Sequence, residues 1–123
     1  MKALGTHLLL ELKSCSVEVL DDLPFIQDAL IFAAQSTGAT IIGHTFHKFS
    51  PQGVTGVVAI AESHVCIHTW PEYAYAAADI FTCGDGFDPK KAADILVEKL
   101  KAKDVTVTEL ERGIFEKSPL SVP

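Results

Sequence analysis

A short run in the middle of the chain brings together residue types that can do chemistry. Glu62 and Ser63 follow an apolar segment, and His64, Cys66 and His68 then fall at every second position. A period of two is that of a β-strand, whose alternate side chains share one face. Two imidazoles and a thiol beside a serine offer either nucleophilic and acid–base chemistry or metal binding.

Metal binding is the weaker of these two interpretations. His64, Cys66 and His68, together with His44 or His47, supply borderline and soft ligands that zinc accepts. The sequence has no Cys-x-x-Cys or His-x-x-x-His pair, which are the spacings typical of zinc sites. We therefore expect no metal, and a His/Cys metal-binding protein remains the less favoured alternative.

Composition places the chain among ordinary globular proteins. Its 123 residues suit one domain, 48% of them are apolar, and no apolar stretch approaches the roughly 20 residues of a membrane span. The start of the chain lacks the features of a secretory signal, and three scattered cysteines do not indicate a disulfide framework. We expect a cytoplasmic protein with reduced thiols and no membrane partner.

The charge balance argues against nucleic acid as a partner. The formal net charge is −6, and the ten Lys and Arg residues form no dense basic cluster that could neutralise several phosphates. An acidic surface is compatible with a cationic ligand, although many proteins share this balance.

The elements that must position the reactive run can be predicted from periodicity and from turn and capping residues. Strands are expected at residues 4–12, 40–49, 54–61, 63–70, 75–82 and 104–111. Helices are expected from Pro24 to about Ser36 and from Pro89 to about Leu100, each preceded by a capping aspartate. The tail from residue 113 to 123 has no periodic pattern, so we expect it to be loose.

This order predicts an α+β fold, a two-layer sandwich whose antiparallel-rich sheet is covered on one face by two helices. The strands at 54–61 and 63–70 are joined almost directly, which places the Glu62–Ser63 bond in or beside a sharp turn. The other face of the sheet lacks cover, so we expect dimerisation through that face or through a sheet edge.

Several motifs in this order resemble the prokaryotic, pyruvoyl-dependent S-adenosylmethionine decarboxylase proenzymes. The matching residues are Glu62-Ser63-His64, Ile67 to Tyr73 (IHTWPEY), Asp79 and Phe81 to Gly84 (FTCG). Shorter matches at Leu4-Gly5, residues 38–40, 45–49, Gly53 and 56–58 extend the resemblance over most of residues 4–112. Several separate motifs in the right order are more specific than one short pattern.

The resemblance implies a proenzyme that cuts itself between Glu62 and Ser63. A β chain (1–62) and an α chain (63–123) would remain associated, and Ser63 would become a pyruvoyl group that forms a Schiff base with the substrate amine. His68 corresponds to the base of the processing reaction, and Cys83 corresponds to the proton donor of the decarboxylation.

The resemblance also implies a substrate and a set of binding residues. The substrate would be S-adenosylmethionine, whose decarboxylated product donates aminopropyl groups in polyamine (spermidine) synthesis. Glu72 matches a carboxylate that holds the ribose hydroxyls, and Phe49 and Trp70 are candidates for stacking on adenine and attracting the sulfonium. Each aromatic could equally pack in the core. The expected assembly is a homodimer of processed αβ units.

The sequence departs from the family pattern at two positions, and the resemblance also leaves one alternative substrate class open. Thr55 stands where many relatives have a serine thought to assist processing, and it keeps the hydroxyl. Cys66 replaces a usual Ser or Thr, and we expect it to pack as a small apolar residue. Some relatives act on arginine or ornithine with the same pyruvoyl chemistry, and Ser63, His68 and Cys83 would not distinguish these substrates.

Overall fold

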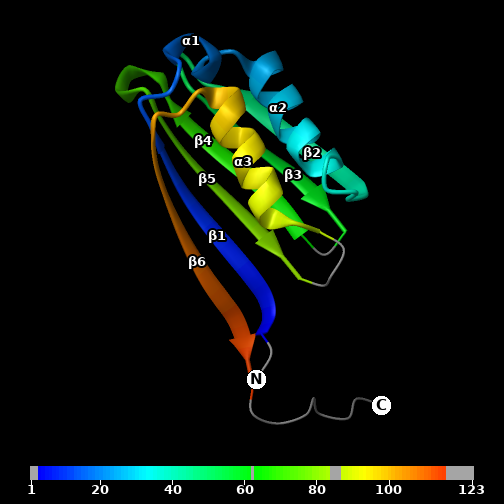
Figure 1. The fold of residues 1–123 in the computed structure, drawn as a ribbon. Helices are drawn as coiled ribbons and strands as arrows, with labels where there is room; N and C mark the ends of the chain where they lie inside the picture. Colours follow the sequence, from blue (N-terminus) through cyan, green and yellow to red (C-terminus); the bar gives the residue numbers. More distant parts are fainter. Residues whose placement is uncertain (1–2, 62, 84–86, 116–123) are drawn as a thin grey trace.

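The computed structural model describes residues 3–61, 63–83 and 87–115, and Figure 1 shows their fold. The elements in chain order are β1 (Ala3–Lys13), α1 (Val17–Leu20), α2 (Leu23–Gln35), β2 (Ile41–Lys48), β3 (Val54–Ile60), β4 (Ser63–Trp70), a 3-10 turn η1 (Pro71–Tyr73), β5 (Tyr75–Thr82), α3 (Pro89–Leu100) and β6 (Asp104–Ile114). The helices α2 and α3 lie side by side on one face of the sheet. The predicted α+β sandwich is therefore confirmed.

One six-stranded sheet contains all the strands, in the spatial order β2-β3-β4-β5-β1-β6. Every neighbouring pair is antiparallel. The strand β4, which begins at Ser63, is an interior strand paired on both sides. The first strand of the chain, β1, lies between β5 and β6, far from β2 in the sheet.

Both long helices begin at an aspartate that caps the free backbone N–H groups. The Asp22 carboxylate accepts a hydrogen bond from the backbone N–H of Phe25, at 3.1 Å. Asp88 does the same for Lys90 and Lys91, and a proline follows each cap within the first turn. The short helix α1 was not predicted, because its four residues have no periodic pattern and no capping side chain.

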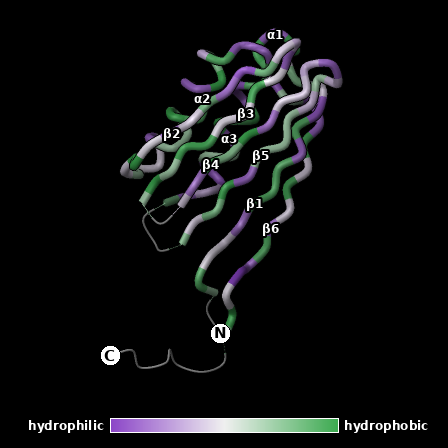
Figure 2. Tube along the Cα trace, turned by 180° about the vertical axis from the view of Figure 1, so that it is seen from behind, coloured by the Kyte–Doolittle hydropathy of each residue, from purple (hydrophilic) through white to green (hydrophobic). Residues whose placement is uncertain are grey.

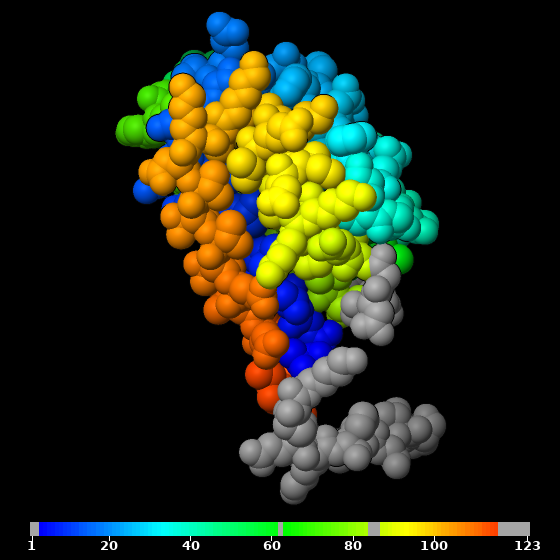
Figure 3. Space-filling model, in the orientation of Figure 1, coloured from blue at the N-terminus to red at the C-terminus, as the bar shows by residue number. Residues whose placement is uncertain are grey.

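The core lies between the sheet and the two helices. Alternate residues of the interior strands point toward the helices and are buried, as are Leu30 of α2 and Leu96 of α3. On the strands these buried residues include Leu8, Leu10, Leu12, Val54, Val58, Ile60, Val65, Ile67, Ala76, Ala78 and Ile80. The helices cover the middle of the sheet, and β1 and β6 run on beyond them (Figure 3).

The opposite face of the sheet carries no helix from residues 3–61, 63–83 or 87–115, and we call it the open face. On the interior strands its residues alternate with the core residues, so polar and apolar positions are interleaved in the view from this side (Figure 2). Leu9, for example, lies between the buried Leu8 and Leu10 and is 38% exposed. No helix among the described residues covers the open face, as the sequence predicted.

The predicted boundaries need one correction and one restriction. The last strand does not stop at Glu111 but continues to Ile114, because it pairs with β1 along its whole length up to the contact of Ala3 with Ile114. The rest of the expected tail, residues 116–123, lies outside the described residues. No helix in the described part of the chain has the length and apolar character needed to cross a bilayer.

Substitution of a core strand residue tests this layer arrangement. Ile80→Ala removes a fully buried side chain from the middle of β5, so we expect the free energy of unfolding of the intact chain to fall by about 2–5 kcal/mol. Ile42→Ala is the matched control, since Ile42 is 72% exposed, and it should change that free energy by less than about 0.5 kcal/mol. Urea denaturation measures both, and equal losses would contradict the assigned faces.

Candidate active site

Ser63 is the first residue of β4 and directly follows the tight connection from β3. It pairs with Ile60 of β3 and with Thr82 of β5. The Ser63 hydroxyl donates a hydrogen bond to Oγ1 of the buried Thr82, at 3.1 Å. Cys83 follows Thr82 in the chain, so Ser63 and Cys83 lie at the same end of the sheet. Glu62, the other half of the predicted cleavage site, lies outside the described residues.

A second group of predicted residues gathers at the opposite end of β4. A cavity of about 300 Å³ lies there, lined by Phe49, Gln52, Gly53, Thr55, His68, Thr69, Trp70 and Glu72. The Thr55 hydroxyl is 3.0 Å from Nδ1 of His68, within hydrogen-bonding distance. The methyl group that distinguishes Thr55 from serine therefore leaves this contact intact.

The two groups do not meet within one chain. Ser63 and His68 are five residues apart on one strand, which corresponds to about 16 Å at the usual rise per residue. An odd separation also puts them on opposite faces: Ser63 shares the helix-covered face with Val65 and Ile67, whereas His68 lies on the open face. A reaction that needs both side chains must therefore take one of them from a second copy of the chain.

The aromatic candidates lie at the surface of this cavity rather than in the core. Trp70 is 40% exposed and stacks on Tyr75, with ring centroids 5.4 Å apart and an interplanar angle of 28°. Phe49 is 46% exposed and packs edge-on against His47. Both rings are therefore accessible to a ligand, and packing in the core does not explain their presence.

Tyr75 stacks on Trp70 and also contacts Glu11. The Tyr75 hydroxyl donates a hydrogen bond to the Glu11 carboxylate. Burial, followed by the hydrogen bond and the negative charge of Glu11, raises the pKa of Tyr75 to about 12. The phenol therefore stays neutral at pH 7 and keeps its donor role. Neither Glu11 nor Tyr75 was singled out from the sequence, because glutamate and tyrosine carry no signal of a contact between residues so far apart.

Asp21 fixes the loop that borders the cavity. Its Oδ1 accepts hydrogen bonds from the Gly53 backbone N–H and from Nζ of Lys48, each at 2.9 Å. The Gly53 hydrogen bond, reinforced by Lys48, holds the pKa of Asp21 below its usual value. The buried Thr69 hydroxyl continues this anchorage, since it accepts from the Val54 N–H and donates to the Leu20 carbonyl, both at 2.8 Å.

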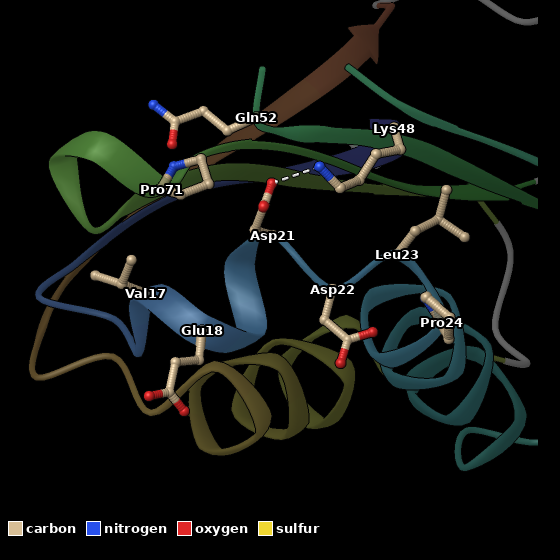
Figure 4. Close-up of a pocket in the computed structure, with 9 residues that line it drawn as sticks. All are labelled: Val17, Glu18, Asp21, Asp22, Leu23, Pro24, Lys48, Gln52 and Pro71. Atoms are coloured by element: carbon tan, nitrogen blue, oxygen red, sulfur yellow. Dashed lines mark hydrogen bonds and ion pairs between the residues drawn. The ribbon is translucent and has the colours of Figure 1, made fainter. Parts of the chain in front are cut away.

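A larger depression of about 720 Å³ lies on the other side of Asp21, between α1, the start of α2 and the hairpin of β2 and β3. Figure 4 shows the Asp21–Lys48 ion pair at its edge and the side chains of Glu18 and Asp22 around it. None of the residues predicted to be catalytic or substrate-binding lines it. The smaller cavity is therefore the better candidate for the site.

The row of potential ligands at alternate positions of β4 is too widely spaced to form a metal site. His64, Cys66 and His68 are successive side chains on one face of β4, spaced roughly 7 Å apart, too far for one ion. Instead, His64 turns toward Asp79 and His7, and among the described residues these three have ligand atoms within 4.8 Å of one another. Burial, and then the charge of Asp79, raises the pKa of Cys66 to about 11, so its thiol stays protonated.

Comparison with known proteins identifies the relatives of this chain. The family model described as S-adenosylmethionine decarboxylase matches residues 6–113. An S-adenosylmethionine decarboxylase proenzyme of Caldanaerobacter subterraneus is 51% identical over 117 residues, covering 95% of this chain and 94% of that protein. A proenzyme of the same name from Thermotoga maritima is 54% identical over 116 residues, covering 94% of this chain and 89% of that protein.

Among solved structures, the crystal structure of the adenosylmethionine decarboxylase of Aquifex aeolicus has the same fold. Its TM-score is 0.89 at 35% sequence identity, and the match covers 98% of this chain and all of that one. The similarity therefore includes both ends of β4, where the two groups of candidate residues lie.

Titration of Tyr75 tests its contact with Glu11, next to the cavity-lining Trp70. In a Tyr73→Phe chain, Tyr75 is the remaining tyrosine, and we expect its pKa, followed by phenolate absorbance, to be about 12. Glu11→Gln should lower that pKa part of the way toward the ordinary tyrosine value of about 10, because it removes the negative charge while burial remains. An unchanged pKa would show that Glu11 does not contact the phenol.

Proposed function

The chain belongs to the S-adenosylmethionine decarboxylase family, and on that premise we propose that it makes a pyruvoyl group from Ser63 and uses it to decarboxylate S-adenosylmethionine. The observation that carries the proposal is the position of Ser63. It is the first residue after a tight connection, at the start of an interior strand, and Thr82 holds its hydroxyl. A serine in this setting directly follows the peptide bond that its hydroxyl would attack.

Self-processing then follows from the chemistry of that serine. The Ser63 Oγ attacks the Glu62 carbonyl carbon, and the C–N bond breaks as the nitrogen takes up a proton, so that an amide becomes an ester. A base then removes the Ser63 α-proton, and the ester oxygen leaves with Glu62 as a carboxylate. Hydrolysis of the remaining dehydroalanine releases ammonia. The products are a β chain of residues 1–62 and an α chain of residues 63–123.

The pyruvoyl group supplies a ketone that can bind the substrate amine and accept the electrons released when carbon dioxide leaves. The surrounding residues would then bind the substrate and protonate the product. Cys83 lies beside residue 63 at the same end of the sheet, where it can return a proton to carbon. No metal is needed for these steps.

The geometry also supports a complete site that is built from two copies of the chain. His68 cannot reach Ser63 of its own strand, about 16 Å away. If two open faces stack about a two-fold axis, the Ser63 end of one sheet can lie over the His68 end of the other, and the reverse. The second imidazole would then face the backbone of residue 63, where the α-proton is removed, because the Ser63 side chain itself points to the helix-covered face. We therefore propose a homodimer in which Ser63 and Cys83 of one copy work with Thr55, His68 and Glu72 of the second.

The cavity fits this arrangement and the proposed substrate. Its volume of about 300 Å³ is at the lower limit for a ligand site, as expected of a pocket completed by a second sheet. The exposed Glu72 carboxylate can accept hydrogen bonds from both hydroxyls of a ribose. The exposed rings of Phe49 and Trp70 can stack on adenine or attract a sulfonium. A cytoplasmic location and a role in polyamine synthesis remain predictions that accompany this assignment.

Denaturing mass spectrometry gives the first test. The purified wild-type protein should separate into two fragments divided before Ser63, and Ser63→Ala should remain intact and inactive, because no hydroxyl remains to attack. Ser16→Ala is a suitable control, since its side chain makes no capping hydrogen bond, and it should process normally. Cleavage of Ser63→Ala after Glu62 would refute the mechanism. Release of carbon dioxide from arginine or ornithine, but not from S-adenosylmethionine, would instead correct the substrate.

Complementation tests the two-copy site. Cys83→Ala should process but turn over slowly, and Glu72→Gln should process but bind substrate weakly. When the two variants are co-expressed, activity should recover to about a quarter of the wild-type rate, because half of randomly formed dimers are mixed and each has one intact site of two. A mixture no more active than the sum of its parts would show that each chain builds its own site.

A further inference from the structure

Asp79 lies at the centre of a polar cluster on the open face that the proposed mechanism does not use. Its Oδ2 is 2.8 Å from Nε2 of His7 on β1 and 2.9 Å from Nε2 of His64 on β4. The cluster therefore joins three neighbouring strands through their side chains. The ring of Phe81 packs against both imidazoles, with centroids 5.4 and 5.9 Å away, and shields one side of the cluster.

The proton positions in this cluster follow from Arg112 of β6. A guanidinium can only donate, and Nη1 of Arg112 lies 3.5 Å from Nδ1 of His7, so Nδ1 is the acceptor. The proton of His7 is then on Nε2, where it is donated to Asp79. A metal bound to Nε2 would move that proton to Nδ1, against Arg112. The cluster is thus better suited to holding hydrogen bonds than to holding a cation.

The location of the cluster gives it a consequence for the reaction. His64 is the residue directly after Ser63 and pairs with Phe81, which in turn pairs with His7. Cleavage would make residue 63 a chain end, and chain ends fray unless they are tied down. Conversion of Ser63 also removes its Oγ, which leaves with Glu62, and with it the hydrogen bond to Thr82. His64 is then the first side chain that can anchor the new end.

We propose that Asp79, held by His7, is a positioning residue that clamps His64 and so fixes the ketone-bearing end of the α chain. This inference rests on the proposed function, because it needs residue 63 to be a chain end. The clamp acts after processing and contacts neither the substrate nor the reacting atoms. It joins the α chain not only to its own strand β5 but also to β1, which belongs to the β chain.

Asp79→Asn tests the clamp with little change in shape. Both imidazoles contact the single oxygen Oδ2, a position that the Asn amide oxygen can also occupy, but the amide carries no negative charge, so both hydrogen bonds lose their charge assistance and the anchor weakens. We expect complete cleavage, a KM close to wild type and a kcat lower by about ten- to a hundredfold, the usual effect of a misplaced reacting group. Asp94→Asn makes the same charge change on the exposed side of α3 and should leave kcat unchanged.

A pair of variants at His7 separates the hydrogen bond from packing, and it decides the matter if Asp79→Asn does not fold. Glutamine can present its amide N–H near the position of Nε2, so His7→Gln should keep kcat within about threefold of wild type. His7→Leu fills the space without a donor and should lower kcat by about tenfold. A purely steric role would make the two variants equal.

The outcomes distinguish this proposal from the proposed function. If the wild-type chain is never cleaved, both fail. If it is cleaved and active but Asp79→Asn and His7→Leu turn over at the wild-type rate, only the clamp is refuted. Failure of a folded Asp79→Asn chain to cleave would also refute it, because Asp79 would then act before the chain end exists. So would stoichiometric zinc in the wild type that is lost in Asp79→Asn.

Discussion

The pleat of β4 is the constraint on which the rest of the site depends. A strand turns successive side chains to opposite faces, so the odd separation of Ser63 and His68 divides them between the core face and the open face. The pairing of β4 with β3 and β5 on both sides makes this register rigid. The strand can thus place the Ser63 hydroxyl and the His68 imidazole accurately, but one chain cannot bring them together.

The open face combines two requirements that usually conflict. In the proposed dimer the open face would lose much of its contact with water, yet it carries the polar side chains of His7, His64, Asp79, Glu11 and Tyr75. The conflict is reduced because the polar groups satisfy one another, Asp79 with two imidazoles and Glu11 with a phenol. Among the described residues, no buried side-chain nitrogen or oxygen lacks a hydrogen-bond partner. Paired in this way, such groups can be covered at modest cost.

Much of the fold could be predicted from the sequence because its signals are local. The alternation in residues 63–70, the turn at 50–53 and the caps at Asp22 and Asp88 each depend on a few neighbouring residues. The insertion of β1 between β5 and β6 has no such signal. His7 and Asp79 are 72 residues apart, and only the completed sheet brings them into contact. The sequence therefore supplied the candidate residues, whereas their division into two distant groups could be seen only in the structure.

The sheet order has a final consequence for the two fragments that the proposed cleavage would produce. Residues 1–62 supply β1, β2 and β3, and residues 63–123 supply β4, β5 and β6, so in the order β2-β3-β4-β5-β1-β6 the two fragments alternate. The pair β4 and β5 is enclosed between strands of the other fragment, and neither piece can leave without opening the sheet. A cut molecule would therefore be held together kinetically. If a cut molecule unfolded, its two fragments would have to reassociate in a concentration-dependent step, so cleavage would make later unfolding difficult to reverse.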